Sequence, residues 1–459
     1  MDWQVVHIRI ADANSGQAIP VRLRLRGAEG QVLAPLGRWS DLTPHGRQAP
    51  GHVLVDGELC HYVEGACEAR LPAGAIEVVA AHGPGYHPTT MTWTRRAGQV
   101  ALRCALSPRR QPAAEGWYAG DPMVTNLSPQ AAWLEGAGEG LSVVLLAATD
   151  ERSLLDFSAQ APALERTGTL VAVGTWNGHG TTTGLLLHHS HRVVFPLRLA
   201  DEGFQHYTVD DWAQQCHRKR GWVIWPVSEL DAEVMATLLH DQIDALGITL
   251  DTNPRDALKL AYQLWDADRP VGLVAGSAKT DALRAVGCWR TWVQLPPGEP
   301  LTFTQWIESA RLRRAFISRG PWLHLEVNGQ GPGAVFSMAP SRLQLRALAA
   351  DVEEDVDLEV VSDGEVVASA VGSEQVQCEL AQAWPDAGWV AVRCWSRGGE
   401  LLAHSNPVTL GGGQSRRTQA REHLLGQLSE KTSRLSAAEA KRLSTSLTEA
   451  RAHWEALKP

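Results

Sequence analysis

Hydrophobic and polar positions alternate with a period of two along the first hundred residues of the chain. Val21, Leu23 and Leu25 alternate with arginines, which predicts a strand with one buried face and one wet face. The stretch 14–16 (Asn-Ser-Gly) supplies a turn before this strand. This pattern predicts that residues 1–107 form a β-sandwich.

After residue 116 the pattern changes, and apolar runs alternate with amphipathic segments until about residue 321. Runs that are apolar at nearly every position are typical of strands covered on both faces. The predicted buried strands are residues 141–148, 170–174 and 193–197, and the predicted helices are residues 151–164 and 231–246. Such an alternation predicts an α/β domain at 116–321, built as a parallel barrel or an open parallel sheet.

The chain returns to a β pattern at 322–410, where Asp363-Gly364 marks a hairpin turn. Three consecutive glycines then lead into a helical tail at 414–459. Ser436 and Glu439 form a capping box for a helix in this tail. The apolar residues that share one face of that helix are Leu443, Leu447, Ala450, Trp454 and Leu457. This face predicts docking on the body of the protein, with a dimer surface as the alternative.

Composition and charge exclude several classes of partner. A net charge of -9 argues against nucleic acid and anionic membranes. No run of about 18 apolar residues is present, so no membrane-spanning helix is expected. No signal segment precedes the first predicted strand, which predicts a cytoplasmic protein, and the seven scattered cysteines predict reduced thiols. The partner, a small molecule or another protein, and the oligomeric state stay open.

The stretch that opens the α/β domain carries a resemblance to a known family. Residues 116–126 read Gly-Trp-Tyr-Ala-Gly-Asp-Pro-Met-Val-Thr-Asn. This stretch resembles the entry strand of the CehA/McbA metallohydrolases, a branch of the PHP superfamily, in which Gly-Trp-Tyr-x-Gly-Asp-x-His-x-His supplies two metal-binding histidines. Asp121 matches the pattern, whereas Met123 and Thr125 stand at the two histidine positions.

Two further phrases extend this resemblance. The segment 269–280 is similar to a family segment with a Gly-Ser-Asp triplet, and Ala278 stands at the position of its metal-binding aspartate. The segment 221–226 is similar to a strand that ends in His-Pro, and Trp225 stands at the histidine position. The resemblance implies a PHP-like distorted barrel whose site lies at the carboxyl ends of the strands.

The N-terminal sandwich carries a second resemblance. Its segments 11–20 and 71–74 resemble the carboxypeptidase-regulatory or Cna-B type of sandwich. That resemblance implies a role as scaffold or lid, and not a role in catalysis.

The four replacements decide the expected chemistry. Zinc and manganese bind imidazole and carboxylate ligands, whereas these positions offer a thioether, a hydroxyl, an indole and a methyl group. We therefore expect no metal cofactor at this site, with Trp225 filling the space of the ions, and a binding or structural role. The alternative is a metal-dependent hydrolase of ester, carbamate or phosphoester bonds that uses zinc or manganese at a rearranged site.

Other polar residues complete the set of candidates. The resemblance places Asp121, Glu229 and Lys279 near the former site, and Asp121 serves equally well as a turn cap or as a ligand. His189 and His191 have the His-x-His spacing that puts two imidazoles on one face of a strand, which makes them the candidate ligands of a displaced metal. The simpler interpretation is that both histidines face water in a loop.

Overall fold

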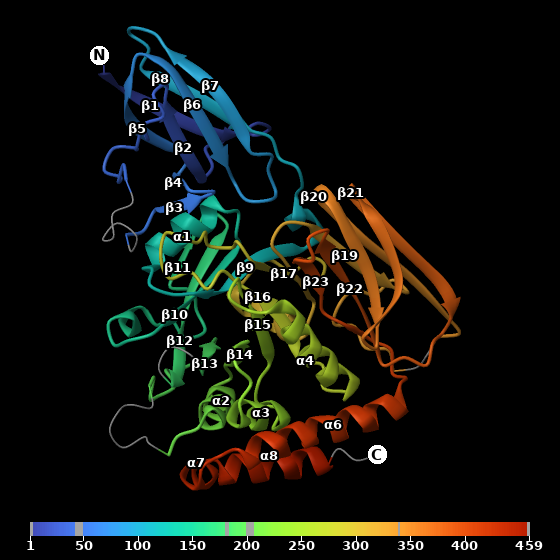
Figure 1. The fold of residues 1–459 in the computed structure, drawn as a ribbon. Coiled ribbons are helices and arrows are strands. Elements are labelled where there is room, and N and C mark those ends of the chain that lie inside the picture. Colours follow the sequence, from blue (N-terminus) through green and yellow to red (C-terminus); the bar gives the residue numbers. More distant parts are fainter. Residues whose placement is uncertain (1–2, 42–48, 180–182, 199–205, 338–339, 457–459) are drawn as a thin grey trace.

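The structure is a computed structural model that describes residues 3–41, 49–179, 183–198, 206–337 and 340–456. It shows a mixed α/β protein of several parts (Figure 1). A β-sandwich lies at the amino-terminal end, a curled sheet lies at the centre, and a second β module flanks it. Helices at the carboxyl-terminal end lie across the helical side of the centre.

The N-terminal sandwich has a sheet of order β5-β1-β8 and a sheet of order β3-β4-β2-β6-β7. Its strands are β1 (Trp3–Asp12), β2 (Val21–Gly27), β3 (His52–Val55), β4 (Glu58–Val63), β5 (Ala66–Pro72), β6 (Gly74–Ala81), β7 (Thr89–Arg95) and β8 (Ala101–Leu106). The alternation in β2 places Val21, Leu23 and Leu25 in the core and leaves the intervening arginines partly exposed. The period-two pattern therefore predicted this region correctly.

The central strands follow the order β16-β15-β14-β13-β12-β10-β9. They are β9 (Trp117–Val124), β10 (Val143–Ala148), β12 (Thr169–His179), β13 (Thr183–His188), β14 (Trp222–Pro226), β15 (Ala245–Ile248) and β16 (Gly272–Ala275), with the short β11 (Leu164–Arg166) beside β12. All are parallel to their neighbours except β13 and β11. A parallel bridge between Val124 and Lys279 brings the two ends of the series together. We call these seven strands, without β11, the curled sheet.

Helices pack around the curled sheet, and one of them covers the end at which its strands begin. They are α1 (Pro129–Gly138), α2 (Val209–Arg218), α3 (Ala232–Leu239), α4 (Pro254–Asp266) and α5 (Phe303–Arg311). Helix α5 covers the amino ends of the strands, where Trp306 packs on Trp222 and donates a hydrogen bond to the carbonyl of Tyr118. Phe303 and Ile307 belong to the same apolar cluster inside the curled sheet. This helix therefore closes the base of the curled sheet.

Three local predictions for this region are wrong in whole or in part. Residues 151–164 contain a 3-10 turn at Ser153–Asp156 and the start of β11 in place of a helix. Residues 193–197 form no strand, and the chain there has a cis bond between Phe195 and Pro196. The predicted helix 231–246 is confirmed only over Ala232–Leu239, and β15 begins at Ala245. In all three cases, apolar residues whose spacing suggested one element belong in part to a loop or to a strand.

The second β module continues the same sheet beyond β9. Its strands are β17 (Arg290–Gln294), β18 (Ala315–Ser318), β19 (Trp322–Val327), β20 (Arg342–Ser362), β21 (Glu365–Ala383), β22 (Trp389–Ser396), β23 (Leu401–Ser405) and β24 (Val408–Thr409). Asp363 and Gly364 form the predicted turn between β20 and β21, both at positive φ. Strand β17 pairs with β9, so the module shares its hydrogen-bonded sheet with the curled sheet.

The tail consists of α6 (Gln414–Ser433), α7 (Ala437–Arg442) and α8 (Ser444–Ala456). The capping box of Ser436 and Glu439 begins α7 as predicted. Leu443, Leu447 and Trp454 are buried in the cluster that also holds α2, α3 and α4, so the predicted docking on the body is confirmed. Leu457 lies outside the described residues.

Two further expectations concern the chain as a whole. Across the described parts of the chain, no helix is both long and apolar enough to cross a membrane. The seven cysteines are unpaired, as the scattered spacing predicted.

Candidate functional site

The carboxyl ends of the central strands surround a cavity of about 630 Å³, which we call the mouth cavity. The loops that follow β9, β10, β14, β15 and β16 all contribute to it. The lining residues are Met123, Thr125, Asn126, Thr149, Trp176, Leu186, Arg198, Pro226, Val227, Ser228, Thr249, Asp251, Ala278, Thr280, Asp281, Leu283 and Arg284. This location is where α/β sheets place their ligands.

Three of the four replaced ligand positions meet at the mouth cavity. Met123, Thr125 and Ala278 all line it. The backbone N–H and the hydroxyl of Thr125 donate to the carbonyl of Lys279, each at 3.1 Å, which joins the end of β9 to the loop after β16. Gly276 permits this approach, since a Cβ there would lie 2.4 Å from Asp121 and 2.9 Å from the Cβ of Met123.

Trp225 is the exception, and its expected role is corrected. Successive side chains of β14 point to opposite faces, so Ile224 faces the interior while Trp225 faces the helices. Trp225 is fully buried in the apolar cluster that also holds Trp212 of α2. The next residue, Pro226, lines the mouth cavity. Trp225 therefore does not fill the space at the mouth.

Asp121 is a structural anchor in this geometry. Its carboxylate is fully buried and accepts backbone hydrogen bonds from Met123 at 3.1 Å, Ser277 at 3.1 Å and Gly287 at 2.8 Å. Burial raises the pKa of Asp121, and these hydrogen bonds oppose the rise. The carboxylate thus ties β9 to the loops after β16, which agrees with the turn-capping interpretation.

Neither Lys279 nor Glu229 lines the mouth cavity. The ammonium group of Lys279 is buried, lies 3.2 Å from the carboxylate of Glu135 on α1, and donates to the carbonyls of Asp281 and Arg284. Glu229 is exposed on the loop after β14 and is not among the lining residues. Lys279 therefore holds the loop after β16 onto α1.

The candidate pair His189 and His191 is not on one face of a strand. Strand β13 ends at His188, and His189 has a left-handed backbone with φ of 57°. The His189 ring packs edge-on against Phe303 at the closed base, whereas His191 is exposed and lies 2.9 Å from the carbonyl of Lys219. Among the described residues, the structure brings no third ligand to these two imidazoles.

Sequence reasoning missed the residues that give the mouth cavity its chemical character. Trp176 lines it in a half-buried position, and Arg198 is exposed at its rim. Arg284 and Asp251 form a two-armed ion pair across the cavity, at 2.6 Å and 2.5 Å, which lowers the pKa of Asp251. The signal that could have located this cavity was position along the chain. Thr149 also lines the cavity, and it directly follows the predicted buried strand 141–148.

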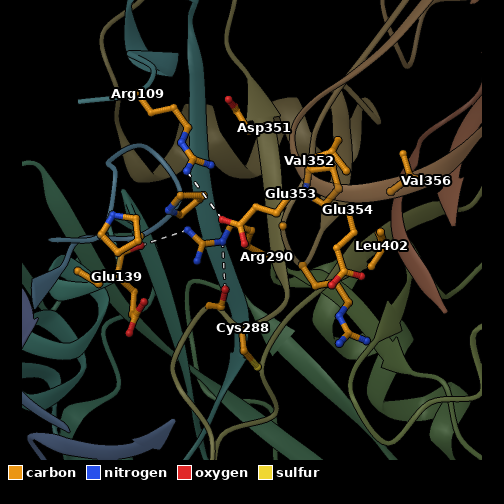
Figure 2. A pocket seen from close by; sticks show the side chains of 18 of the residues that line it. Arg109, Glu139, Cys288, Arg290, Asp351, Val352, Glu353, Glu354, Val356 and Leu402 are labelled. Atoms are coloured by element: carbon orange, nitrogen blue, oxygen red, sulfur yellow. Dashed lines mark hydrogen bonds and ion pairs between the residues drawn. The ribbon is translucent and has the colours of Figure 1, made fainter. Parts of the chain in front are cut away.

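A second cavity of about 570 Å³ lies between the sandwich, the curled sheet and the second β module (Figure 2). Several of its charged groups are already paired. Arg290 is buried and donates to the carbonyls of Gly287 and Glu139, and Arg22 lies 2.5 Å from the Glu139 carboxylate. We assign this cavity to the joint between the three parts of the molecule.

One group of side chains outside both cavities has the composition of a metal site. Asp210, His240 and Glu449 bring one ligand atom each to within 4.8 Å of one another. It is the only such group of three or more histidine, cysteine, aspartate or glutamate side chains within the described ranges.

Comparisons with known proteins give limited information. No protein-family model matches the sequence, and no curated protein matches it. One similar solved structure is a two-domain protein from Bacteroides vulgatus containing a predicted PHP-like metal-dependent phosphoesterase, with a TM-score of 0.35 and 9% identity over 64% of this chain and 95% of that chain. Another is an engineered protein with a TM-score of 0.18 and 12% identity over 61% of this chain and 79% of that chain. Structural similarity at these scores does not establish a shared fold.

Proposed function

We propose that this chain is a PHP-like protein of the CehA/McbA type whose mouth cavity binds a small organic molecule without a catalytic metal. The observation that carries the proposal is the meeting of Met123, Thr125 and Ala278 at one cavity. A thioether, a hydroxyl and a methyl group do not replace imidazole and carboxylate as ligands of zinc or manganese. The cavity nevertheless has a volume of about 630 Å³, in the range typical of ligand sites.

The lining favours a ligand with a ring and an anionic or ester group. Trp176 offers an aromatic surface on which a ring can pack, and Met123 and Leu186 extend the apolar wall. Arg198 and Arg284 lie at the same cavity and can donate to a carboxylate or a carbonyl oxygen. A ring-bearing carboxylic acid matches both parts of this surface.

Calorimetry with 4-hydroxybenzoate and related aromatic acids tests this function. We expect wild-type protein to bind at least one of these acids and Trp176→Ala to bind it at least tenfold more weakly. Trp93→Ala, in the sandwich, is the matched control and should bind like wild type. Absence of binding by all the acids would contradict the ligand class.

Hydrolysis assays test the absence of catalysis. We expect no turnover of 4-nitrophenyl acetate or bis(4-nitrophenyl) phosphate above that of buffer. Turnover that is lost on chelation and restored by zinc or manganese would establish the alternative, a hydrolase with a rearranged site.

A variant with restored ligands tests the PHP-like frame. The variant carries Met123→His, Thr125→His and Ala278→Asp, and it keeps Trp225 because that side chain faces the helices. We expect this variant to gain a zinc ion at the mouth cavity that wild type lacks there. If no zinc is gained by a folded variant, the assignment of these positions to a former metal site is wrong.

A further inference from the structure

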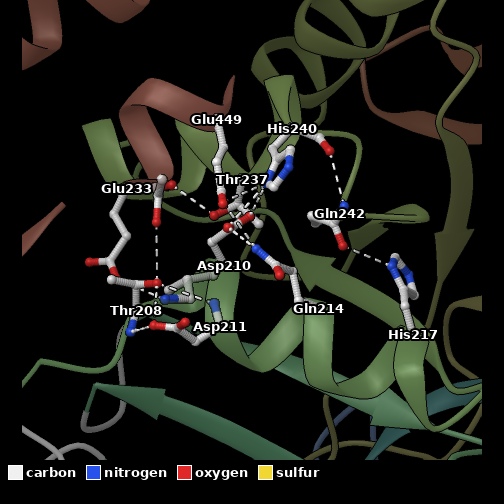
Figure 3. Close-up of polar contacts among 12 residues, drawn as sticks. Thr208, Asp210, Asp211, Gln214, His217, Glu233, Thr237, His240, Gln242 and Glu449 are labelled. Atoms are coloured by element: carbon white, nitrogen blue, oxygen red, sulfur yellow. Dashed lines mark hydrogen bonds and ion pairs between the residues drawn. The ribbon is translucent and has the colours of Figure 1, made fainter. Parts of the chain in front are cut away.

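The junction between the tail and the helical layer gathers metal-ligand side chains from three helices (Figure 3). Asp210 lies in the first turn of α2, His240 caps the carboxyl end of α3, and Glu449 projects from α8. We propose that these three side chains bind one divalent transition-metal ion, with zinc as the best match, and that the ion fastens α8 to α2 and α3.

The distances between the ligand atoms fit such an ion. Bonds of about 2.0–2.1 Å to a tetrahedral zinc place neighbouring ligand atoms roughly 3.3 Å apart. Nδ1 of His240 lies 3.0 Å from Oδ1 of Asp210 and 3.8 Å from Oε2 of Glu449. Adjustments of less than about 1 Å, which side-chain rotation can supply, would bring both contacts to the spacing of a tetrahedral site.

The two carboxylates at the junction share the same few hydrogen-bond donors. Both carboxylates face Nδ1 of His240, which carries at most one hydrogen. The amide of Gln214 also donates to both carboxylates, at 2.8 Å to Asp210 and 3.3 Å to Glu449. A cation among the three side chains would instead interact with each of the carboxylate and imidazole lone pairs at once.

Charge favours a cation at the same place. The Asp210 side chain is 2% exposed, and the structure records no Lys or Arg ion pair for Asp210 or Glu449 among the described residues. The neighbouring Glu233, by contrast, is paired with Arg442 at 2.7 Å. A buried carboxylate with another carboxylate beside it is stabilised by a divalent ion.

The site also has an open position. The Glu449 side chain is 43% exposed and that of His240 is 17% exposed, so water reaches one side of the group. Three protein ligands and one water complete a four-coordinate zinc. One imidazole and two carboxylates form a donor set for zinc, cobalt or manganese, and zinc binds most tightly among these three.

Metal titration of the full chain, purified without an affinity metal and treated with chelator, tests the proposal. We expect calorimetry to show about one zinc ion per chain, and we expect zinc to raise the melting temperature by at least about 2 °C. Cobalt should give the visible absorption bands of a tetrahedral site. His240→Gln and Glu449→Gln should each weaken zinc binding at least tenfold while leaving the circular dichroism spectrum unchanged.

Matched controls separate this site from other sources of zinc binding. His206→Gln and Glu455→Gln change exposed residues of the same types and should bind zinc like wild type. Zinc binding that survives both His240→Gln and Glu449→Gln would overturn the proposal, as would a wild-type chain that binds no zinc. Neither result would touch the proposed binding of an organic acid at the mouth cavity, because that test uses no metal.

Discussion

The mouth cavity and the junction formed by Asp210, His240 and Glu449, which we call the tail junction, differ in their side-chain chemistry and in how the chain brings their residues together. At the mouth, strand ends that the resemblance associates with metal carry Met123, Thr125 and Ala278. At the tail junction, where no motif pointed, Asp210 and Glu449 flank an imidazole. Ligand-type side chains are therefore scarce where the resemblance implies them and grouped where three helices meet.

This difference indicates that the contacts that hold a cavity in shape can be independent of the side chains that give it reactive groups. The mouth is held by contacts that do not depend on a metal, such as the backbone hydrogen bonds to Asp121 and the buried contact of Lys279 with Glu135. These contacts do not use the side chains of Met123 or Ala278. The tail junction depends on side-chain contacts between helices, so its chemistry and its stability are linked.

Removal of the tail should have the largest effect on this comparison. Cutting the chain after Gly413 exposes the partners of Leu424, Leu428 and Trp454, each of which is buried. Burial of one such side chain contributes about 1.5–3 kcal/mol, so we expect a melting temperature at least about 10 °C lower by calorimetry. Removal of residues 457–459 alone is the control. An unchanged melting temperature in a monomeric truncation would contradict docking, and loss of a dimer at an unchanged melting temperature would favour a dimer surface.

The frame of the mouth should be almost as sensitive. Lys279→Met leaves the buried Glu135 without its cationic partner, and we expect a loss of about 3–5 kcal/mol in the free energy of unfolding, measured with denaturant. The exposed substitution Lys259→Met should change this free energy by less than about 0.5 kcal/mol. Pairing Lys279→Met with Glu135→Met should recover most of the loss. A loss below about 1 kcal/mol in the single variant would mean that the pair does not hold the mouth.

Acid should weaken the interior of the curled sheet through His188. Burial lowers the pKa of this histidine from 6.5 to about 4, and its Nε2 lies 3.0 Å from the carbonyl of Pro122. The unfolded chain therefore takes up a proton first, so stability falls as the pH decreases from 6.5 to about 4, by roughly 3 kcal/mol. His188→Gln should remove this part of the pH dependence of unfolding.

The matched control for this measurement is His206→Gln, since His206 is exposed. His404, whose pKa burial lowers to about 3, should leave a residual acid sensitivity in the His188→Gln variant. An unchanged pH profile in that variant would show that His188 is not the buried group that the structure describes.

The smallest effect on stability is expected at the rim of the mouth cavity. Arg284→Met removes an ion pair whose Asp251 side chain is 65% exposed, and such exposed pairs contribute about 0.2–1 kcal/mol. We expect little change in melting temperature but a severalfold weaker affinity for 4-hydroxybenzoate by calorimetry. Arg192→Met, at an exposed position away from the cavity, should change neither. Unaltered affinity in Arg284→Met would exclude this arginine from ligand binding.

The sequence predicted those features that depend on local periodicity or on spacing within one strand. Alternation located the sandwich, and the resemblance located Met123 and Thr125, which lie two residues apart on one face of the chain. It failed at Trp225, because the face that a side chain takes depends on the strand's register.

The tail junction was beyond the reach of sequence reasoning for a different reason. Asp210, His240 and Glu449 are far apart along the chain, and none stands in a recognisable motif. Only the docking of α8 onto the body brings the third side chain to the other two. The direction of the Lys279 side chain could not be predicted for a related reason, because no sequence pattern links Lys279 to its partner Glu135 on α1.

Helix α5 restricts how any molecule can use the curled sheet. Among the described residues, Phe303 and Trp306 fill its amino end, so a molecule would reach the mouth cavity past the loops that carry Thr125 and Ala278. A linear polymer cannot thread through such a dead end, so a chain-like ligand would be recognised at its terminus and not along its length. Release would also have to reverse the route of entry, so two molecules could not exchange by passing one another through opposite openings.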